Sequence, residues 1–132
     1  MGYCVSISID RVRITPEQVK GCLAAINEMH TGQDAHKFSW VNGRVFKTLR
    51  EALDEWRYEA HANEEKGGIT IEYFIGEKWG DDELLFQTIA PFVAGDEGSI
   101  EVRGEDGDQW RYCFVNGTLK EERRSQEWIP ST

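Results

Sequence analysis

The chain has 132 residues, of which 39% are hydrophobic and 11% aromatic, a composition that suits one packed core and excludes a wholly disordered protein. Its 24 acidic residues outnumber its 15 lysines and arginines, which gives a formal net charge of −9. A surface of that sign repels nucleic acid and membranes, so neither is expected as a direct partner. We expect a single domain over residues 1–132, with a short flexible C-terminal tail from about residue 125.

The N-terminus and the cysteines bear on the compartment. Residues Met1 to Asp10 lack the basic start and long apolar centre of a signal peptide, and apolar stretches elsewhere are short. The three cysteines (Cys4, Cys22 and Cys113) are scattered through apolar segments, which is typical of buried thiols in a reducing compartment. We therefore expect a cytoplasmic protein.

Two elements are predicted at the N-terminus. Residues 3–14 alternate apolar and polar side chains and are rich in β-branched residues, which predicts a strand. Thr15 then suits the N-cap of a helix, with Pro16 at the first helical position. Apolar residues recur at helical spacing after them, and Gly32 ends the predicted helix.

The next segment predicts a hairpin and a second helix. Asn42-Gly43 favours a tight turn between two short strands, over 38–41 and 44–47. Thr48 begins a capping box, and the apolar stripe after it predicts a helix that ends near Asn63.

A strand and a third helix follow. Residues 69–75 alternate and predict a central strand, with one side formed by Ile69, Ile71, Tyr73 and Ile75. Asp81 or Asp82 then suits the cap of a helix that Pro91 ends or kinks.

The C-terminal third predicts a meander of three strands, over 99–103, 109–115 and 118–124, joined by turns that contain Gly107 and Asn116-Gly117. With the elements before it, this gives an α+β fold. We expect a largely antiparallel sheet of about six to seven strands, with three helices packed mainly on one face.

Signatures of catalysis and metal binding are missing from the sequence. No serine or cysteine has the glycine-flanked context of an activated nucleophile, and the histidines at 30, 36 and 61 form no recognisable motif. No Cys-x-x-Cys or His-Glu-x-x-His is present, and the turn Glu105 to Asp108 lacks the ligand spacing of a calcium loop. We expect no metal, no cofactor and no enzymatic activity, although a sequence cannot show which carboxylates converge in space.

Residues 104–114 (GEDGDQWRYCF), preceded by 89–93 (IAPFV), resemble a group of small bacterial and phage proteins. The likeness covers the C-terminal third and the segment around Trp56. It implies a setting in the bacterial cytoplasm or on a mobile element, and it carries over no functional residue.

Charge supplies the leading hypothesis for function. From Glu72 to Asp108 the chain has eleven acidic residues against Lys78 and Arg103, interleaved with Trp79, a residue type favoured as an interface anchor. We expect a non-enzymatic inhibitor, such as an anti-CRISPR-like phage anti-defence protein or an immunity protein. Its partner would be a basic nuclease or nucleic-acid-binding effector, whose phosphate-binding surface it blocks. The candidate contact residues are Trp79, Asp81, Asp82, Glu83, Asp96, Glu97, Glu105, Asp106 and Asp108.

The alternative hypothesis is a small-molecule-binding domain or small enzyme, with a pocket between the sheet and its helices. His36, His61 or a carboxylate pair would supply its polar groups. An exposed sheet edge could pair two copies, so monomer and homodimer both stay open.

Overall fold

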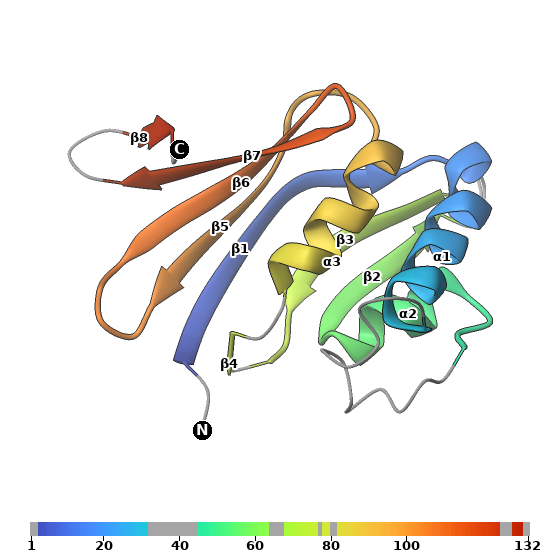
Figure 1. Cartoon of the computed structure of the whole chain (residues 1–132), viewed down its shortest axis with the longest axis horizontal. Coiled ribbons are helices and arrows are strands. Elements are labelled where there is room, and N and C mark those ends of the chain that lie inside the picture. The colour runs from blue at the N-terminus through green and yellow to red at the C-terminus, as the bar shows by residue number, and fades with distance from the viewer. Residues whose placement is uncertain are drawn as a thin grey trace.

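The computed structural model describes residues 3–31, 45–63, 68–76, 78–79, 82–124 and 128–130. They form one antiparallel sheet with three α-helices on one face, which confirms the predicted α+β fold (Figure 1). The strands are β1 (Tyr3–Ile14), β2 (Tyr58–Asn63), β3 (Gly68–Phe74), β4 (Lys78–Trp79), β5 (Gly98–Gly104), β6 (Gln109–Val115), β7 (Thr118–Arg124) and β8 (Trp128–Pro130). The helices are α1 (Pro16–Thr31), α2 (Leu49–Glu55), α3 (Asp82–Ile89) and a 3₁₀ turn, η2 (Ala90–Phe92).

The strand order is β2-β3-β1-β5-β6-β7-β8, and every pair is antiparallel. The short strand β4 lies off this path and pairs with the beginning of β1. The first strand in sequence is therefore the centre of the sheet, joined to both halves.

β1 is long, and it bends at a bulge. Its pairing with β3 shifts register between Ser8 and Val12, and Arg11 there has a left-handed φ of 56°. Opposite the bulge lies Gly98, where a Cβ would come within 2.9 Å of the Arg11 carbonyl oxygen. Only glycine fits that position without a backbone shift.

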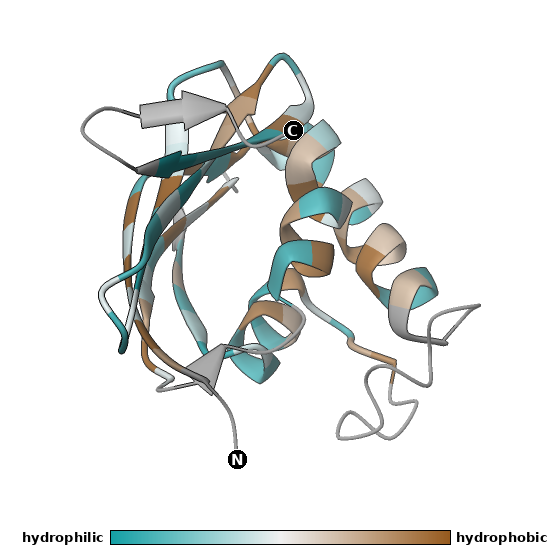
Figure 2. Cartoon of the chain, turned by 60° about the vertical axis from the view of Figure 1, so that its left-hand side comes forward, coloured by the Kyte–Doolittle hydropathy of each residue, from teal (hydrophilic) through white to brown (hydrophobic). Residues whose placement is uncertain are grey.

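The three helices cover the same face of the sheet, as Figure 2 shows from the side. Their apolar stripes meet the inward side chains of the strands in one core. Its buried members include Cys22 and Ile26 of α1, Leu49, Ala52 and Leu53 of α2, Leu85, Phe86 and Ile89 of α3, and Val12, Ile14, Tyr58, Ile71, Ile100, Val102, Trp110, Tyr112 and Phe114 of the sheet. These buried side chains form the layer between the helices and the sheet.

The predicted strand over 44–47 is wrong for its described part, because residues 45–47 are not in a strand. Phe46 is buried, and its backbone groups bond the Asn27 side chain of α1 instead of another strand. The Asn27 Nδ2 donates to the Phe46 carbonyl at 3.0 Å, and the Phe46 N–H donates to Asn27 Oδ1 at 2.8 Å. The companion strand over 38–41, the turn Asn42-Gly43 and Gly32 lie outside the described residues.

The predicted helix up to Asn63 is also wrong. α2 begins after the Thr48 cap as predicted, where Thr48 Oγ1 accepts from the Glu51 N–H at 3.1 Å, but it ends at Glu55. Arg57 then takes a left-handed φ of 70°, and the chain continues as β2. The apolar residues at 56 and 60 fit a helical period, whereas Tyr58 and Ala60, both buried, fit a strand.

In β3, the predicted alternation of side chains is wrong beyond Ile71, because Ile71 and Tyr73 lie on opposite sides of the sheet. Glu59 pairs with Tyr73 and Ala60 with Ile71, so β3 holds one more residue than β2 at this point. This bulge reverses the alternation beyond Ile71. Ile71 faces the core, whereas Tyr73 points to the opposite side of the sheet.

The other helices and strands predicted for the described residues form. α1 and α3 begin where their caps place them, Pro91 ends α3, and the meander β5–β6–β7 forms as expected. β8, in the segment where we expected a tail, pairs with β7. No described helix is long and apolar enough to cross a membrane.

Candidate functional site

The face of the sheet on which none of the described helices lies, here called the open face, holds a row of side chains from six neighbouring strands. Each member is the direct cross-strand partner of the next, so the row runs across the sheet. Its members are Glu59, Tyr73, Ser8, Glu101, Arg111 and Glu122.

On the β5–β7 side of the open face, charged side chains are tied to one another. Arg111 Nε donates to Glu122 Oε1 at 2.6 Å. With its amide oxygen turned toward β5, Gln109 accepts from Arg103 Nε at 2.8 Å and from Arg103 Nη2 at 2.7 Å. These bonds draw the Arg103 guanidinium toward β6 and away from β1.

Next to Arg103, the open face is hollowed. β1 contributes only the small side chains of Ser6 and Ser8 here, and with Glu101 and Arg103 they line a hollow of about 150 Å³. The hollow lies along the central strand, where the sheet presents hydroxyl groups and a carboxylate to solvent.

The large side chain of Tyr73 borders this region, and Ile75 follows just beyond the end of β3. Tyr73 lies opposite Ser8, and both Tyr73 and Ile75 are 58% exposed. Phe74 between them turns to the helix side, where its ring centroid lies 5.0 Å from that of Tyr58. The sequence analysis placed Tyr73 on the same side of the sheet as Ile71, and it therefore missed the exposure of Tyr73 on the open face. The residue that could have revealed this is Phe74, because an apolar side chain on the opposite side of the strand indicates a bulge.

An acidic turn, defined as Glu105, Asp106 and Asp108, joins β5 to β6 at one end of the sheet. The Glu105 N–H donates to the Cys4 carbonyl at 2.9 Å, and the Asp108 N–H donates to Asp106 Oδ1 at 3.1 Å. The three residues are exposed. The turn therefore presents carboxylates beside the beginning of β1.

The predicted contact residues do not form one surface. Trp79 pairs with Tyr3 at the beginning of β1, so its strand and the acidic turn occupy the same end of the sheet. Asp96 and Glu97 precede β5 and lie at the other end, where Glu97 Oε2 accepts from Arg11 Nη1 at 3.1 Å. Asp81 lies outside the described residues.

Asp82 lies inside the molecule and does not belong to an acidic surface. It is 4% exposed, and Tyr58 Oη donates to its Oδ2 at 2.6 Å. Burial, followed by the Asp82 charge, raises the pKa of Tyr58 well above its usual value, so this phenol stays protonated and keeps donating. The bond joins the start of α3 to β2.

Glu83 differs from Asp82, because it is exposed and faces β7. Its carboxyl lies near Glu121, which is the cross-strand partner of Tyr112. Burial, followed by Glu121, raises the pKa of Glu83, and burial likewise raises the pKa of Tyr112. Glu121 was missed from the sequence, since only the β6–β7 register brings it beside Tyr112.

One of the three cysteines has the buried position that the sequence predicts. This is Cys22, and burial raises the pKa of its thiol to about 12. Cys4 and Cys113 are half-buried, and burial raises the pKa of Cys113 as well. Because the thiolate is the nucleophilic form, neither Cys22 nor Cys113 is activated.

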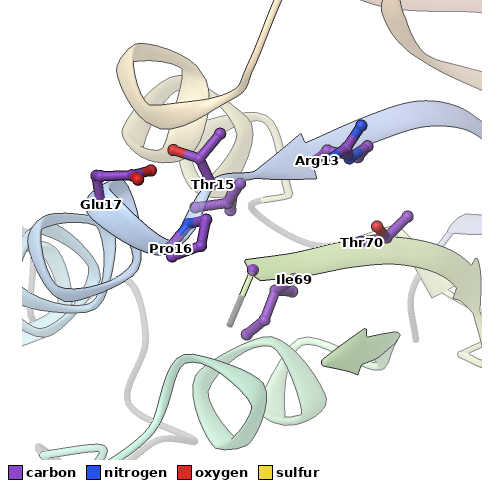
Figure 3. A pocket seen from close by; sticks show the side chains of 8 residues that line it. Arg13, Thr15, Pro16, Glu17, Ile69 and Thr70 are labelled. Carbon is purple, nitrogen blue, oxygen red and sulfur yellow. The ribbon is translucent and has the colours of Figure 1, made fainter. Parts of the chain in front are cut away.

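A larger hollow, about 410 Å³, lies at the end of the sheet where β1 leads into α1 (Figure 3). Arg13 and Thr70 face each other across β1 and β3 there, and Glu17 stands on the first turn of α1. His61 does not line this hollow, although it is the cross-strand partner of Thr70, and its Nε2 lies 3.7 Å from Glu72 Oε2. His36 is outside the described residues. Within the described ranges, no three His, Cys, Asp or Glu side chains group as metal ligands would.

Comparisons with protein-family models, curated proteins and solved structures find no match to this chain.

Proposed function

We propose that this protein is a non-enzymatic inhibitor that binds a basic, phosphate-binding surface of another protein. Its binding surface would consist of Tyr73 and Ile75 as apolar anchors, the hollow lined by Ser6, Ser8, Glu101 and Arg103, here called the β1 hollow, and the acidic turn. The observation that carries the proposal is the exposure, 58% each, of Tyr73 on the open face and of Ile75 just beyond the end of β3. Large apolar side chains that stay exposed together mark protein interaction sites more often than plain surface.

The anchors and the acidic turn are close enough to contact one partner. Tyr73 pairs with Ser8, and the turn pairs with the chain at Cys4, four residues earlier in β1. Because a strand rises about 3.3 Å per residue, this spacing is roughly 13 Å. Standard protein interfaces extend well beyond that length, so a single partner surface can cover both features.

Charge on this surface favours a basic partner. Glu101 and the three carboxylates of the acidic turn outnumber Arg103, whose guanidinium is bonded to Gln109. Lysines and arginines that bind phosphates would meet carboxylates here, which speeds association and discriminates against acidic partners. The apolar anchors would supply most of the affinity, because exposed ion pairs contribute little.

The biological setting follows from the same logic. A protein that covers a phosphate-binding groove blocks nucleic-acid binding without any chemistry of its own, as expected of an anti-defence or immunity protein. Basic nucleases and nucleic-acid-binding effectors are the partner class we propose.

The test is capture from bacterial lysate supplemented with a panel of nucleic-acid-binding effectors, by immobilised wild-type and variant protein, at low and high salt. Two variants change the proposed surface: Tyr73→Ala with Ile75→Ala, and Glu105→Lys with Asp108→Lys. A matched control, Glu28→Lys with Asp54→Lys, makes the same charge change on exposed helix positions.

The proposal requires a basic protein that wild type and the helix control retain, that both surface variants lose, and that high salt releases. Retention unchanged by either surface variant would refute the proposed surface. Retention of nothing at any salt would refute the proposed class of function.

A further inference from the structure

The β1 hollow contains three oxygen-bearing side chains that make no polar contact with the rest of the described chain. Its walls are two pairs of cross-strand partners, Ser6 with Arg103 and Ser8 with Glu101. Within the described residues, neither the two hydroxyls nor the Glu101 carboxylate has a hydrogen bond or an ion pair. Cross-strand partners place their Cβ atoms about 4.5–5.5 Å apart, so these three groups surround one small space.

The two arginines nearest to Glu101 are bonded to other residues. Gln109 of β6 is the cross-strand partner of Arg103, and its amide oxygen accepts from Arg103 Nε at 2.8 Å and from Nη2 at 2.7 Å. These bonds hold the Arg103 guanidinium toward β6, whereas the hydroxyls of the hollow lie on β1. Arg111, the partner of Glu101 on β6, donates to Glu122 of β7 at 2.6 Å. The Glu101 carboxylate therefore lines the hollow without a bond from either guanidinium.

The size of the hollow limits what can enter it. Pockets for small-molecule ligands typically measure about 300–1,000 Å³, whereas this hollow measures about 150 Å³, which suits the end of one side chain. A lysine ammonium is a compact charge with three donors, and it matches one carboxylate and two hydroxyl oxygens around it. An arginine guanidinium is a planar fork that favours both oxygens of one carboxylate, so it gains less from hydroxyls on a separate strand.

We infer that the β1 hollow binds the ammonium group of one lysine of the partner, with Glu101 as the counter-ion and Ser6 and Ser8 as further acceptors. The inference rests on the proposed function, because it names the group by which the basic partner is recognised at this point. Lysine is a common phosphate ligand, so a phosphate-binding surface supplies such a group. Gln109 is a positioning residue, since it keeps the Arg103 guanidinium from filling the hollow and pairing with Glu101.

The test is a titration of the isotope-labelled full chain with the peptide hexalysine, followed by NMR of the backbone amides. Hexalysine should shift the amides of Ser6, Ser8 and Glu101 together and to saturation. Hexaarginine should bind more weakly at these amides, and hexalysine acetylated at each Nζ should not bind there, because acetylation removes the charge. These comparisons use the wild-type protein, so they do not depend on how any variant folds.

Variants of the lining residues test the role of each group. Glu101→Gln removes the counter-ion and should raise the Kd for hexalysine by up to about fivefold, the upper range for an exposed ion pair. Gln109→Leu releases Arg103 to pair with Glu101 and should also raise the Kd, whereas Arg103→Met removes the competing cation and should lower it. The control Glu28→Gln makes the same charge change as Glu101→Gln at an exposed position of α1 and should leave the Kd unchanged.

Three results would each refute the lysine site: no saturable shift at Ser6, Ser8 and Glu101, equal binding of hexaarginine, or equal Kd values for Glu101→Gln and Glu28→Gln. The titration uses no cellular partner, so its outcome is separate from that of the capture experiment. If a basic protein is captured while hexalysine fails to bind the hollow, only the lysine site is lost. If hexalysine binds the hollow while capture retains nothing, the lysine preference is supported and the proposed function is lost.

Discussion

The two faces of the sheet differ in what holds their side chains. On the helix side, apolar groups are buried and even a carboxylate, Asp82, is enclosed and bonded to Tyr58 at 2.6 Å. On the open face, Tyr73 remains 58% exposed, beside serines and paired charges. The contrast indicates that side chains of the helix side stabilise the fold. It also supports the proposal that the open face binds a partner. Substitutions on the two faces should therefore separate stability from binding.

The largest effect is expected from Phe86→Ala, on the helix side. The Phe86 ring packs between Tyr58 and Tyr112, at centroid distances of 5.7 and 5.2 Å. Removing it should lower the free energy of unfolding by about 3–5 kcal/mol, through lost burial and a cavity. Urea denaturation measures this, and Phe86→Leu should cost less than Phe86→Ala, because it removes less buried volume. A loss below about 1 kcal/mol for the alanine variant would contradict the comparison.

A smaller loss is expected from Tyr58→Phe, which keeps the ring but removes the donor to Asp82. A hydrogen bond to a charged group stabilises by about 1.5–3 kcal/mol, and the carboxylate stays buried without it. The unfolding free energy should fall by that amount, as measured by urea denaturation. Tyr73→Phe on the open face makes the same chemical change and serves as the control. Equal losses for both variants would remove the distinction between the faces.

Glu83→Gln tests the pH dependence of the helix side. Because the pKa of Glu83 is raised in the folded state, its contribution to stability is fully present below its unfolded pKa and is lost as pH rises through the folded pKa. The variant lacks this loss, so its unfolding free energy relative to wild type should increase as pH rises from about 4 to 8. Denaturation curves at several pH values measure the difference. A difference that is constant or decreases with pH would contradict the raised pKa.

The smallest effect on stability is expected from Tyr73→Ala on the open face. An exposed side chain outside the core contributes little, so the unfolding free energy should change by no more than about 0.5 kcal/mol. The same variant should lose the partner in the capture experiment. A large loss of stability would mean that Tyr73 supports the fold, and the open face would no longer be a separate binding region.

Much of the fold was predictable because local signals agreed with the tertiary structure. The cap at Thr15 and the glycine and asparagine turns of the meander are local, and these elements form as expected. The helix expected up to Asn63 failed because Trp56 and Ala60 fit a helical period, while Tyr58 and Ala60 fit a strand, and pairing with β3 decides between them.

The candidate site was harder to predict, because it depends on contacts between distant segments. Asp82 and Glu83 are adjacent in the sequence and have the same kind of side chain. Asp82 is nevertheless buried and bonded to Tyr58, whereas Glu83 is exposed and lies near Glu121. Tyr73 becomes exposed only through the β3 bulge, which depends on register with β2. Burial of a polar side chain and placement at a bulge are set by partners far along the chain.

The central position of β1 also has a consequence for folding kinetics. β1 leaves the ribosome before the other described strands, yet its partners in the other half of the sheet are distant, as in the pairing of Ile9 with Ile100. Such non-local pairing has a high contact order, which slows folding because a long loop must close before the contacts form. Until β5 is synthesised, the nascent chain carries an apolar strand with an unpaired edge, a natural substrate for chaperones.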